Sequence, residues 1–490
     1  MSHLTTETFA ENARAALVDE QLRGALHNAT SLFTERRLAA AKSLDNWEEL
    51  RTQARKIKDE TLLDLDQYLE EFERNAKAAG AQVHWARNAE EANQIVSHIA
   101  REASARSVVK AKSMTTEETH LNAALQAEGI EAIETDLGEY IIQLAGETPS
   151  HIIVPAIHKT KGQIANLFMD KLGIEPTDDV DQLTSTARQV LRRKFADADI
   201  GISGANFGVA ETGTILLLEN EGNIRLTTSL PRIHIALMGI EKVIPRFADL
   251  EVFLKLLPRS GTGQHLTTYQ SLITGTKRTA EGEGPDALHI VLLDNGRSRM
   301  LAHPVTRQSL ACIRCGACLN ACPVYQQIGG HAYGSVYPGP IGAVITPQLI
   351  GMKKAAQLPY ASSLCGACRE VCPVKIDIPE LLLHLRAEIT DGHENPAENH
   401  ERTEPGKQQR GSERLAFKLW AMVMTRPRVY EWSVKLSRVM QPLLTRHGKI
   451  GKVGSAMSVL MPPLAAWTSA RDLRPLESKS FRDRWRENNS

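Results

Sequence analysis

The stretch "CIRCGACLNACP", Cys312–Pro323, places four cysteines within eleven residues and decides the fold of the central part of the chain. The three remaining cysteines lie a little further along, at Cys365, Cys368 and Cys372. The N-terminus contains acidic residues and lacks the apolar segment of a secretion signal, so we expect a cytoplasmic protein. An odd number of clustered cysteines in such a protein is typical of metal or redox chemistry rather than of disulfides.

The spacing of the first motif, Cys-x2-Cys-x2-Cys-x3-Cys-Pro, is that of bacterial two-cluster ferredoxins. Three cysteines two residues apart can hold three corners of one iron–sulfur cluster, while the fourth, before the proline, serves the other cluster. Gly316 and Ala317 let the backbone pass close to the cluster and point its amides at the sulfurs. "CGACREVCPV" at 365–374 repeats "CGACLNACPV" at 315–324 with an offset of 50 residues. The duplication therefore predicts two clusters.

The crossing rule of ferredoxins distributes the seven cysteines over these two clusters. Cluster 1 receives Cys312, Cys315, Cys318 and Cys372, and cluster 2 receives Cys322, Cys365 and Cys368. We expect two [4Fe-4S] clusters. The second is completed by a serine oxygen, a water or a partner's ligand, or else it is a [3Fe-4S] cluster. Ser362 stands at the open fourth position, and we interpret it as a turn residue rather than a ligand, because serine hydroxyls bind iron weakly.

Other metal and redox chemistries fit the cysteines less well. A structural zinc site usually pairs two Cys-x2-Cys elements, which a dense run of four cysteines ending in Cys-Pro does not provide. A thioredoxin-like Cys-x-x-Cys leaves five cysteines without a role. Two clusters side by side form a relay for single electrons, so the motifs favour electron transfer over substrate chemistry.

Upstream of the cysteines, short apolar runs alternate with amphipathic segments from about Val83 to Asp294. The strand candidates are 107–112, 130–135, 151–157, 198–203, 214–219, 233–239 and 288–294. This alternation predicts an α/β domain with a mixed, mostly parallel sheet. Residues 214–229, "TILLLENEGNIRLTTS", favour a local hairpin with its turn at Glu221–Asn223. Residues 1–65 are polar with helical periodicity and predict a helical N-terminal extension.

Two residues of the glycine-rich stretch 201–213 are candidates for ligand contact. Glycine-rich loops at strand ends often cradle phosphates or carboxylates, although this one carries neither a dinucleotide nor a Walker motif. Glu211 and Thr212 are placed to face such a ligand. Alternatively, Glu211 accepts hydrogen bonds from backbone amides in a tight loop.

Three histidines are weaker candidates. His234 lies in an apolar strand candidate, where a hydrogen-bonded core histidine is the more frequent outcome. His331 and His384 lie near the cysteine motifs, and we expect them in supporting or surface positions rather than as cluster ligands.

Charge and aromatic content bear on the possible partners. The balance of 58 Lys+Arg and 58 Asp+Glu argues neither for nor against nucleic acid, but with only 5% aromatic residues recognition of stacked bases is not expected, so nucleic acid is not expected as a partner. From Lys407 onward, however, 17 basic residues stand against 6 acidic ones. Such a segment is most often a solvated face, or else it docks onto a partner or an anionic membrane. No run of eighteen apolar residues occurs, so no membrane-spanning helix is expected.

The order of these parts carries a family resemblance. "GANFGVAETGTILL" with "LPRIHIALMGIEKVIP" resembles the lactate-utilisation domain, which is similar to the sugar-phosphate isomerase and CoA-transferase fold. "CIRCGACLNACPVY", "SLCGACREVCPVKIDIPELL" and a basic helical tail follow it. The whole resembles the iron–sulfur subunit of bacterial L-lactate utilisation operons, the LutB/YkgF family, in which the second motif also has three cysteines.

The resemblance implies four parts: a helical extension (1–65), the α/β domain (66–300), an α-helical ferredoxin-type two-cluster domain (301–387), and a linker with a basic helical C-terminal region (388–490). It also implies an electron-transfer subunit in L-lactate oxidation to pyruvate that works with two partner subunits. No flavin or nicotinamide fingerprint is present, so we do not expect this chain alone to oxidise lactate. The alternative is a catalytic oxidoreductase subunit whose α/β domain binds a small acid or acyl substrate beside Glu211. We expect a cytoplasmic location, with peripheral contact at the inner face of the membrane as an option.

Overall fold

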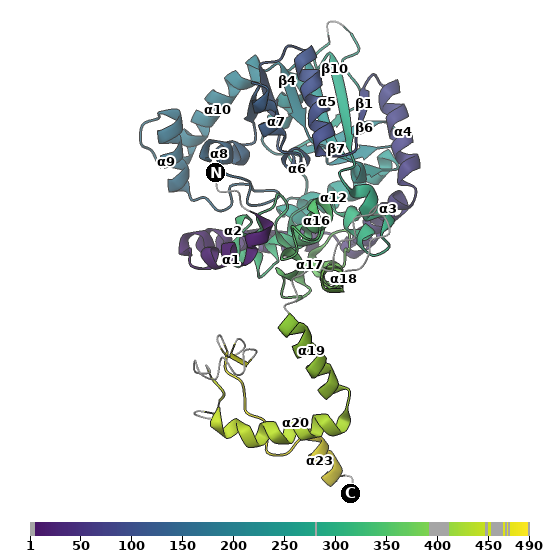
Figure 1. Ribbon diagram of the computed structural model, residues 1–490. Helices are drawn as coiled ribbons and strands as arrows, with labels where there is room; N and C mark the ends of the chain where they lie inside the picture. Colours follow the sequence, from purple (N-terminus) through teal and green to yellow (C-terminus); the bar gives the residue numbers. More distant parts are fainter. Residues whose placement is uncertain are drawn as a thin grey trace. The chain divides into compact units, whose positions relative to one another are not determined.

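The computed structural model describes residues 5–279, 282–391, 411–445, 449–451, 464–465, 468 and 471–488. The chain forms two compact units, Met1–Pro405 and Gly406–Ser490, which are described separately (Figure 1). The first unit contains the sheets and all seven cysteines.

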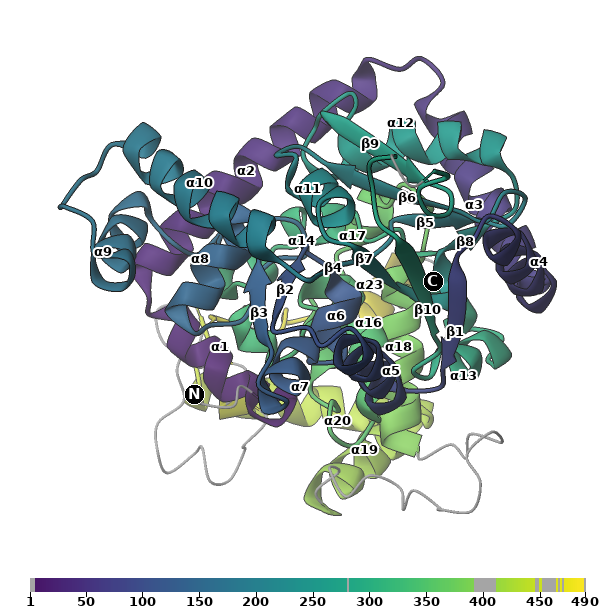
Figure 2. The ribbon, with the colours of Figure 1, turned by 90° about the horizontal axis from the view of Figure 1, so that it is seen from above.

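A six-stranded, fully parallel sheet forms the centre of the first unit (Figure 2). In spatial order its strands are β1 (Gln82–Ala86), β10 (Ala287–Leu293), β7 (Ile233–Gly239), β4 (Ile200–Ser203), β2 (Ser107–Lys110) and β3 (Glu131–Glu134). Strands β7 and β10 are almost entirely buried, as their continuous apolar sequences require in a sheet that is covered on both faces. The prediction of a mostly parallel α/β domain is therefore confirmed.

A second, smaller sheet lies beside the first. Its spatial order is β8 (Val243–Ile244), β5 (Phe207–Val209), β6 (Thr214–Glu219) and β9 (Tyr269–Ile273). Strand β5 pairs with β8 in parallel, and β6 is antiparallel to both of its neighbours. Residues 214–219 thus form the expected strand, but in this mixed sheet.

The hairpin expected at 214–229 is wrong. After β6 the chain turns at Gly222, which has a φ of +80°, and enters helix α11 (Asn223–Ser229). The Glu219 carboxylate accepts hydrogen bonds from the amides of Ile224 (2.6 Å) and Arg225 (2.9 Å). It satisfies two donors of the first helical turn that have no partner within the helix, and this explains why a helix begins there.

The strand expected at 151–157 is also wrong, because this segment forms turns. His151 Nδ1 accepts hydrogen bonds from the amides of Ile153 (3.0 Å) and Val154 (3.2 Å). The Ser150 amide donates to the carbonyl of Pro155 at 3.0 Å. The buried imidazole therefore folds an apolar run, which propensity alone assigns to a strand, into a compact loop.

Helices cover both faces of the parallel sheet. The sheet is contacted directly by α5 (Ala89–Glu102), α10 (Val180–Asp197) and α11, among others. The other helices of this domain are α6 (Met114–Glu118), α7 (Leu121–Ala127), α8 (Leu137–Ala145), α9 (Lys161–Leu172), α12 (Leu250–Gly261) and α13 (Arg297–Ala302). On one face, Val96 and Ile99 of α5 pack with Ile202 and Leu237 of the sheet. On the other face, the apolar core continues without a break into the cysteine region.

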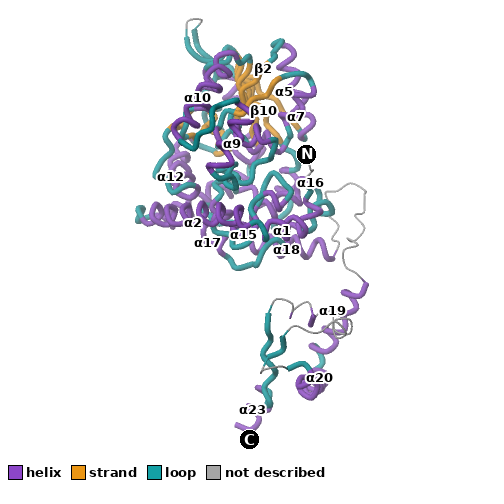
Figure 3. Tube along the Cα trace, turned by 90° about the vertical axis from the view of Figure 1, so that its left-hand side faces the viewer, coloured by secondary structure: helices purple, strands orange, loops and turns teal. Residues whose placement is uncertain are grey.

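Residues 6–63 are helical, as the sequence predicts. Here η1 (Thr6–Thr8), α1 (Phe9–Leu17), α2 (Glu20–Lys42) and α3 (Trp47–Leu63) are followed by α4 (Leu65–Ala78). Helix α2 packs against α12 of the α/β domain. It also packs against α14 (Ala317–Asn320) and α15 (Tyr325–Ile328) of the cysteine region, as Figure 3 shows for α2 and α15. Helix α3 packs against η4 (Thr306–Ala311), directly before the first cysteine. The N-terminal helices therefore form a wall of the cysteine region.

The cysteine region is built from short helices joined by tight loops. Besides η4, α14 and α15, it contains η5 (His331–Tyr333), α16 (Gly339–Ile350), η6 (Leu358–Tyr360), α17 (Ala367–Val371) and α18 (Ile378–Asp391). This agrees with the expected α-helical character of a two-cluster domain.

The described part of the second unit is mainly helical. It contains α19 (Gly411–Met424), α20 (Pro427–Met440), η7 (Gln441–Leu443) and α23 (Phe481–Asn488), and Ile450 pairs with Leu473 in an isolated antiparallel bridge. Across the described parts of both units, no helix combines the length and apolar character needed to cross a membrane.

Candidate metal centre

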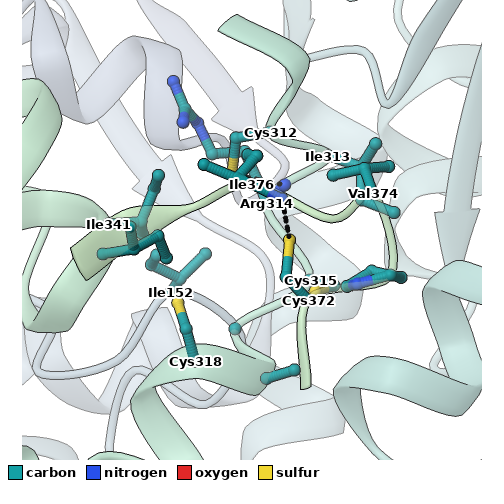
Figure 4. A pocket seen from close by; sticks show the side chains of 14 residues that line it. Ile152, Cys312, Ile313, Arg314, Cys315, Cys318, Ile341, Cys372, Val374 and Ile376 are labelled. Atoms are coloured by element: carbon teal, nitrogen blue, oxygen red, sulfur yellow. Dashed lines mark hydrogen bonds between the residues drawn. The ribbon is translucent and has the colours of Figure 1, made fainter. Parts of the chain in front are cut away.

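Four cysteines from two distant motifs surround one pocket (Figure 4). They are Cys312, Cys315 and Cys318 of the first motif and Cys372 of the second. Apolar side chains complete the wall, among them Ile152, Ile341, Val374 and Ile376. The four residues assigned to cluster 1 from spacing alone are thus brought together.

The local backbone explains how three cysteines of one short segment reach a common pocket. Cys312 ends η4, and Cys318 lies in α14. Between them, Arg314 and Gly316 both have positive φ, +61° and +73°. A Cβ on Gly316 would lie 3.1 Å from the ring of His151, so the 150–155 loop also restricts this position to glycine.

The cysteines assigned to cluster 2 form a second group. Cys322 and Cys368 are buried, and Cys365 is exposed. The three thiols interact electrostatically with one another, so Cys322 of the first motif lies beside the second motif. Each group therefore combines cysteines from both motifs.

Backbone amides point at three of the sulfurs. The donors are Arg314 N to Cys312 Sγ (3.4 Å), Tyr325 N to Cys322 Sγ (3.5 Å) and Ile376 N to Cys372 Sγ (3.4 Å). Such hydrogen bonds stabilise the negative charge of cluster thiolates and influence the reduction potential.

Three thiols of the first pocket, those of Cys315, Cys318 and Cys372, resist ionisation when no metal is bound. Burial, together with neighbouring thiols, raises the pKa of Cys315 to about 12 and the pKa of Cys372 to about 11. The same two causes raise the pKa of Cys318 well above its ordinary value. Thiolates in this pocket therefore need metal cations as partners, and four soft sulfur donors suit iron in an iron–sulfur cluster.

Ser362 occupies the place that Cys312 takes in the first motif. Its Oγ accepts a hydrogen bond from the Leu364 amide at 3.1 Å, which matches the bond from the Arg314 amide to Cys312 Sγ. Leu364, like Arg314, has a positive φ, of +56°. Ser362 therefore keeps the same loop conformation that Cys312 has in the first motif, as a turn residue does.

Two buried arginines of the N-terminal helices hold the backbone around Cys372. Arg51 of α3 donates from Nε (3.0 Å) and Nη2 (2.8 Å) to the carbonyl of Cys372 and from Nη2 to the carbonyl of Glu370 (2.8 Å). Arg37 of α2 donates to the carbonyl of Val371 at 3.2 Å. No local pattern in the sequence indicates these contacts, because the partners lie more than 300 residues apart.

The candidate ligand-contact residues of the α/β domain have structural partners. Glu211 is exposed, and its carboxylate accepts a hydrogen bond from the Phe247 amide at 2.8 Å, so it satisfies a backbone donor. Thr212 is engaged with a neighbouring threonine hydroxyl at 2.8 Å. His234 is fully buried with its Nε2 2.8 Å from the Ser203 hydroxyl, as expected for a core histidine.

His331 and His384 are engaged away from the sulfurs. His331 Nε2 lies 2.6 Å from the carbonyl of Thr148, which accepts its hydrogen bond. His384 Nε2 lies 3.0 Å from the carboxylate of Glu388. These partners agree with supporting or surface positions.

A polar cluster that the sequence reasoning missed lies at the carboxyl ends of β2 and β3. The buried Lys110 ammonium contacts the carboxylates of Glu117 (2.8 Å) and Glu134 (2.7 Å). Burial raises the pKa of Glu139 to about 8 and also raises that of Glu134. Among the described residues, Glu134 and Glu139 each keep one buried carboxyl oxygen without a hydrogen-bond partner. Lys110 and Glu134 are the last residues of β2 and β3, and such charged residues at strand ends are a signal in the sequence, because ligands of open α/β sheets bind at this edge.

Three family models together match most of the chain. They are the LUD domain over residues 69–293, a 4Fe-4S dicluster domain over 308–376, and the C-terminal domain of lactate utilisation protein B over 384–490. An α/β domain of this kind joined to a cysteine-rich dicluster domain defines a class of iron–sulfur proteins.

Similarity to curated proteins extends over the full chain. A lactate utilization protein B of Macrococcus caseolyticus is 43% identical over 484 residues, covering 98% of this chain and 97% of that protein. Its counterpart in Bacillus subtilis is 41% identical over 481 residues, covering 98% and 96%. The chain belongs to the lactate utilization protein B family. A solved DUF162 family protein from Deinococcus radiodurans matches 47% of this chain and 98% of its own with 14% identity, at a TM-score of 0.28.

Proposed function

We propose that this protein is an iron–sulfur electron-transfer subunit in the oxidation of L-lactate to pyruvate. In this proposal, cluster 1 is a [4Fe-4S] cluster held by Cys312, Cys315, Cys318 and Cys372. Cluster 2 is held by Cys322, Cys365 and Cys368 and is a second [4Fe-4S] cluster or a [3Fe-4S] cluster. Two other lactate-utilisation subunits supply the oxidation of lactate and the onward path of the electrons.

The observation that carries the proposal is the crossed arrangement of the cysteines. Each of the two groups combines cysteines from both motifs, the arrangement of a two-cluster ferredoxin. The names of the relatives supply the link to lactate. When bound, the clusters accept and donate single electrons. The chain's own residues exclude water from the pocket and hold the sulfurs with backbone amides.

Iron and sulfide analysis of the anaerobically purified chain tests the cofactors. We expect about seven to eight irons per chain, together with EPR signals that change reversibly when dithionite is added and removed. Four irons or fewer in a fully reconstituted sample would contradict two clusters, and clusters that cannot be reduced would contradict a carrier.

Growth tests the physiological assignment. A strain that lacks this gene and has no second copy is expected to stop growing on L-lactate and to grow normally on pyruvate. The intact gene is expected to restore growth, whereas a copy with Cys315→Ala is not. Unimpaired growth of the deletion strain on L-lactate excludes the assignment.

A second candidate function places a small ligand in the α/β domain. The unpartnered carboxyl oxygens of Glu134 and Glu139 favour it, and they move the candidate position from Glu211 to the carboxyl edge of β3. Thermal unfolding of the full chain with L-lactate or pyruvate tests it. The ligand is expected to raise the melting temperature of the wild type and of Glu211→Gln, but not that of Glu139→Gln. No shift in the wild type leaves electron transfer as the function.

The C-terminal unit is proposed as a docking surface. Large apolar side chains are exposed on α19 and α20, including Trp420, Trp432 and Val439, and the segment has an excess of basic residues. These features suit an anionic membrane surface or a partner subunit. Co-sedimentation with anionic vesicles, but not with zwitterionic vesicles, is expected for a membrane contact. Absence of co-sedimentation excludes the membrane contact and leaves a partner subunit as the candidate.

A further inference from the structure

A buried network of charges reaches from the α/β domain to the cluster 1 pocket. Arg314 lies in the first cysteine motif, and its guanidinium stacks over the ring of Tyr337 at 4.7 Å from the centroid. It also lies 3.4 Å from the Glu241 carboxylate. The second oxygen of Glu241 is 2.6 Å from Arg297 Nε. Arg297 binds both oxygens of Glu118, at 2.8 and 2.9 Å.

Two lysines add positive charge to this network. Lys58 of α3 is buried, and its Nζ donates to the carbonyl of Glu241 at 2.5 Å. Lys242 follows Glu241 in the chain and is also buried. Arg314 lines the pocket of cluster 1. Glu241 joins it to Lys58, which contacts the Glu241 carbonyl, and Lys242 is the next residue in the chain. The positive charges therefore lie beside the pocket.

The network has more cations than anions. The four cations are Lys58, Lys242, Arg297 and Arg314, and the two anions are Glu118 and Glu241. Buried charges without a counter-charge are costly, so this excess favours further negative charge close by. A cluster with four thiolate ligands carries about two negative charges when oxidised and about three when reduced. Cluster 1, once formed, would supply this counter-charge.

The duplicated motif provides an internal comparison. Position 364 is equivalent to position 314 and carries leucine instead of arginine. The two residues have nearly the same φ, +56° and +61°, and their amides make equivalent hydrogen bonds. Arginine is thus not needed for the conformation of the loop. Its charge distinguishes the surroundings of cluster 1 from those of cluster 2.

We propose that the network of Arg314, Glu241, Arg297, Lys58 and Lys242 raises the reduction potential of cluster 1 and couples that potential to the α/β domain. The physical reason is that nearby positive charge stabilises the more negative, reduced cluster. Arg314 acts on the reduction potential of cluster 1 through its charge and not as a ligand. The inference rests on the proposed function, because it requires that cluster 1 forms.

An EPR-monitored redox titration of the anaerobically purified full chain tests the proposal. Arg314→Leu is expected to lower the midpoint potential of cluster 1 and leave that of cluster 2 unchanged. Leu364→Arg is expected to raise the midpoint potential of cluster 2. Arg369→Leu is the control, because it removes an arginine of the second motif whose side chain is 65% exposed. Its effect is expected to be the smallest of the three.

Glu241→Gln separates an electrostatic effect from structural damage. Removing this anion is expected to raise the midpoint potential of cluster 1, opposite to the effect of Arg314→Leu. Damage to the site would instead shift the potential in the same direction in both variants. Where Arg314→Leu loses iron, Lys58→Met removes a cation outside the motif and is expected to lower the potential. Unchanged potentials in variants with wild-type iron content overturn the inference. A wild type without two clusters overturns the proposed function itself.

Discussion

At the scale of single residues, Ser362 shows how a cysteine motif can lose a sulfur without losing its shape. Its hydroxyl accepts the same local hydrogen bond that Cys312 Sγ accepts in the other motif. The arginine at 386 donates to the Ser362 carbonyl at 3.2 Å, so the residue is held through its backbone as well. One contact lies within the loop and the other comes from α18, and neither involves a metal.

Ser362→Ala is therefore expected to keep the full iron and sulfide content and the EPR spectrum of the wild type. The side chain loses one hydrogen bond worth about 0.5–1.5 kcal/mol. Metal analysis and EPR check this outcome, with Cys368→Ala as the control that loses cluster 2. A loss of iron or a changed cluster 2 spectrum in Ser362→Ala would instead assign the serine oxygen as a ligand.

Glu139 links the stability of the protein to pH. Its pKa of about 8 in the folded protein exceeds the value of about 4.3 for an unfolded glutamate, so the folded state binds the extra proton. The contribution of this proton to the free energy of unfolding is fully present below the unfolded pKa and is lost as pH rises through about 8. Burial is the main cause of this raised pKa, nearby Lys112 and Lys110 oppose it, and Glu134 and Glu117 increase it.

We expect wild-type stability relative to Glu139→Gln to fall as pH rises from about 5 to about 9. Thermal unfolding of both proteins at several pH values measures this difference. A constant difference over that range contradicts the raised pKa.

At the scale of elements, the N-terminal helices act through two buried arginines. Arg51→Met removes the hydrogen bonds to the carbonyls of Cys372 and Glu370, each worth about 1.5–3 kcal/mol for a charged donor. We expect lower thermal stability and faster loss of cluster 1 iron to a chelator. Lys56→Met on the same helix is the control, because the Lys56 side chain is 74% exposed. Equal rates of iron loss in the two variants would contradict the role of Arg51.

The elements also show what could be predicted from the sequence. The parallel strands were predictable because their apolar runs are buried on both faces, as in β7 and β10. The grouping of the cysteines followed from spacing, because ligand distances restrict the backbone. The turns at 151–157 and helix α11 depend on single side chains, His151 and Glu219, that bind backbone amides. Propensity and periodicity do not register such contacts.

At the scale of the whole molecule, the N-terminal helices and the cysteine region belong to one compact unit. A chain that lacks residues 1–63 loses a wall of the cluster 1 region, including both arginines. We expect it to lose cluster 1 during anaerobic gel filtration, whereas a chain that ends at Asp391 keeps both clusters. Iron analysis of the eluted proteins measures this. Retention of all iron without residues 1–63 contradicts the structural role of these helices.

The contact between Arg51 and Cys372 can form only late in the synthesis of the chain. The two residues are 321 positions apart, so Arg51 leaves the ribosome roughly 15–60 s before its partner at ordinary rates of synthesis. For most of that interval the elements against which α2 and α3 pack, α12, η4, α14 and α15, are themselves still being made. In the proposed ligand set Cys372 is also the last cysteine of cluster 1 to be made, so delivery of iron and closure of the N-terminal helices would both wait for the same late segment of the nascent chain.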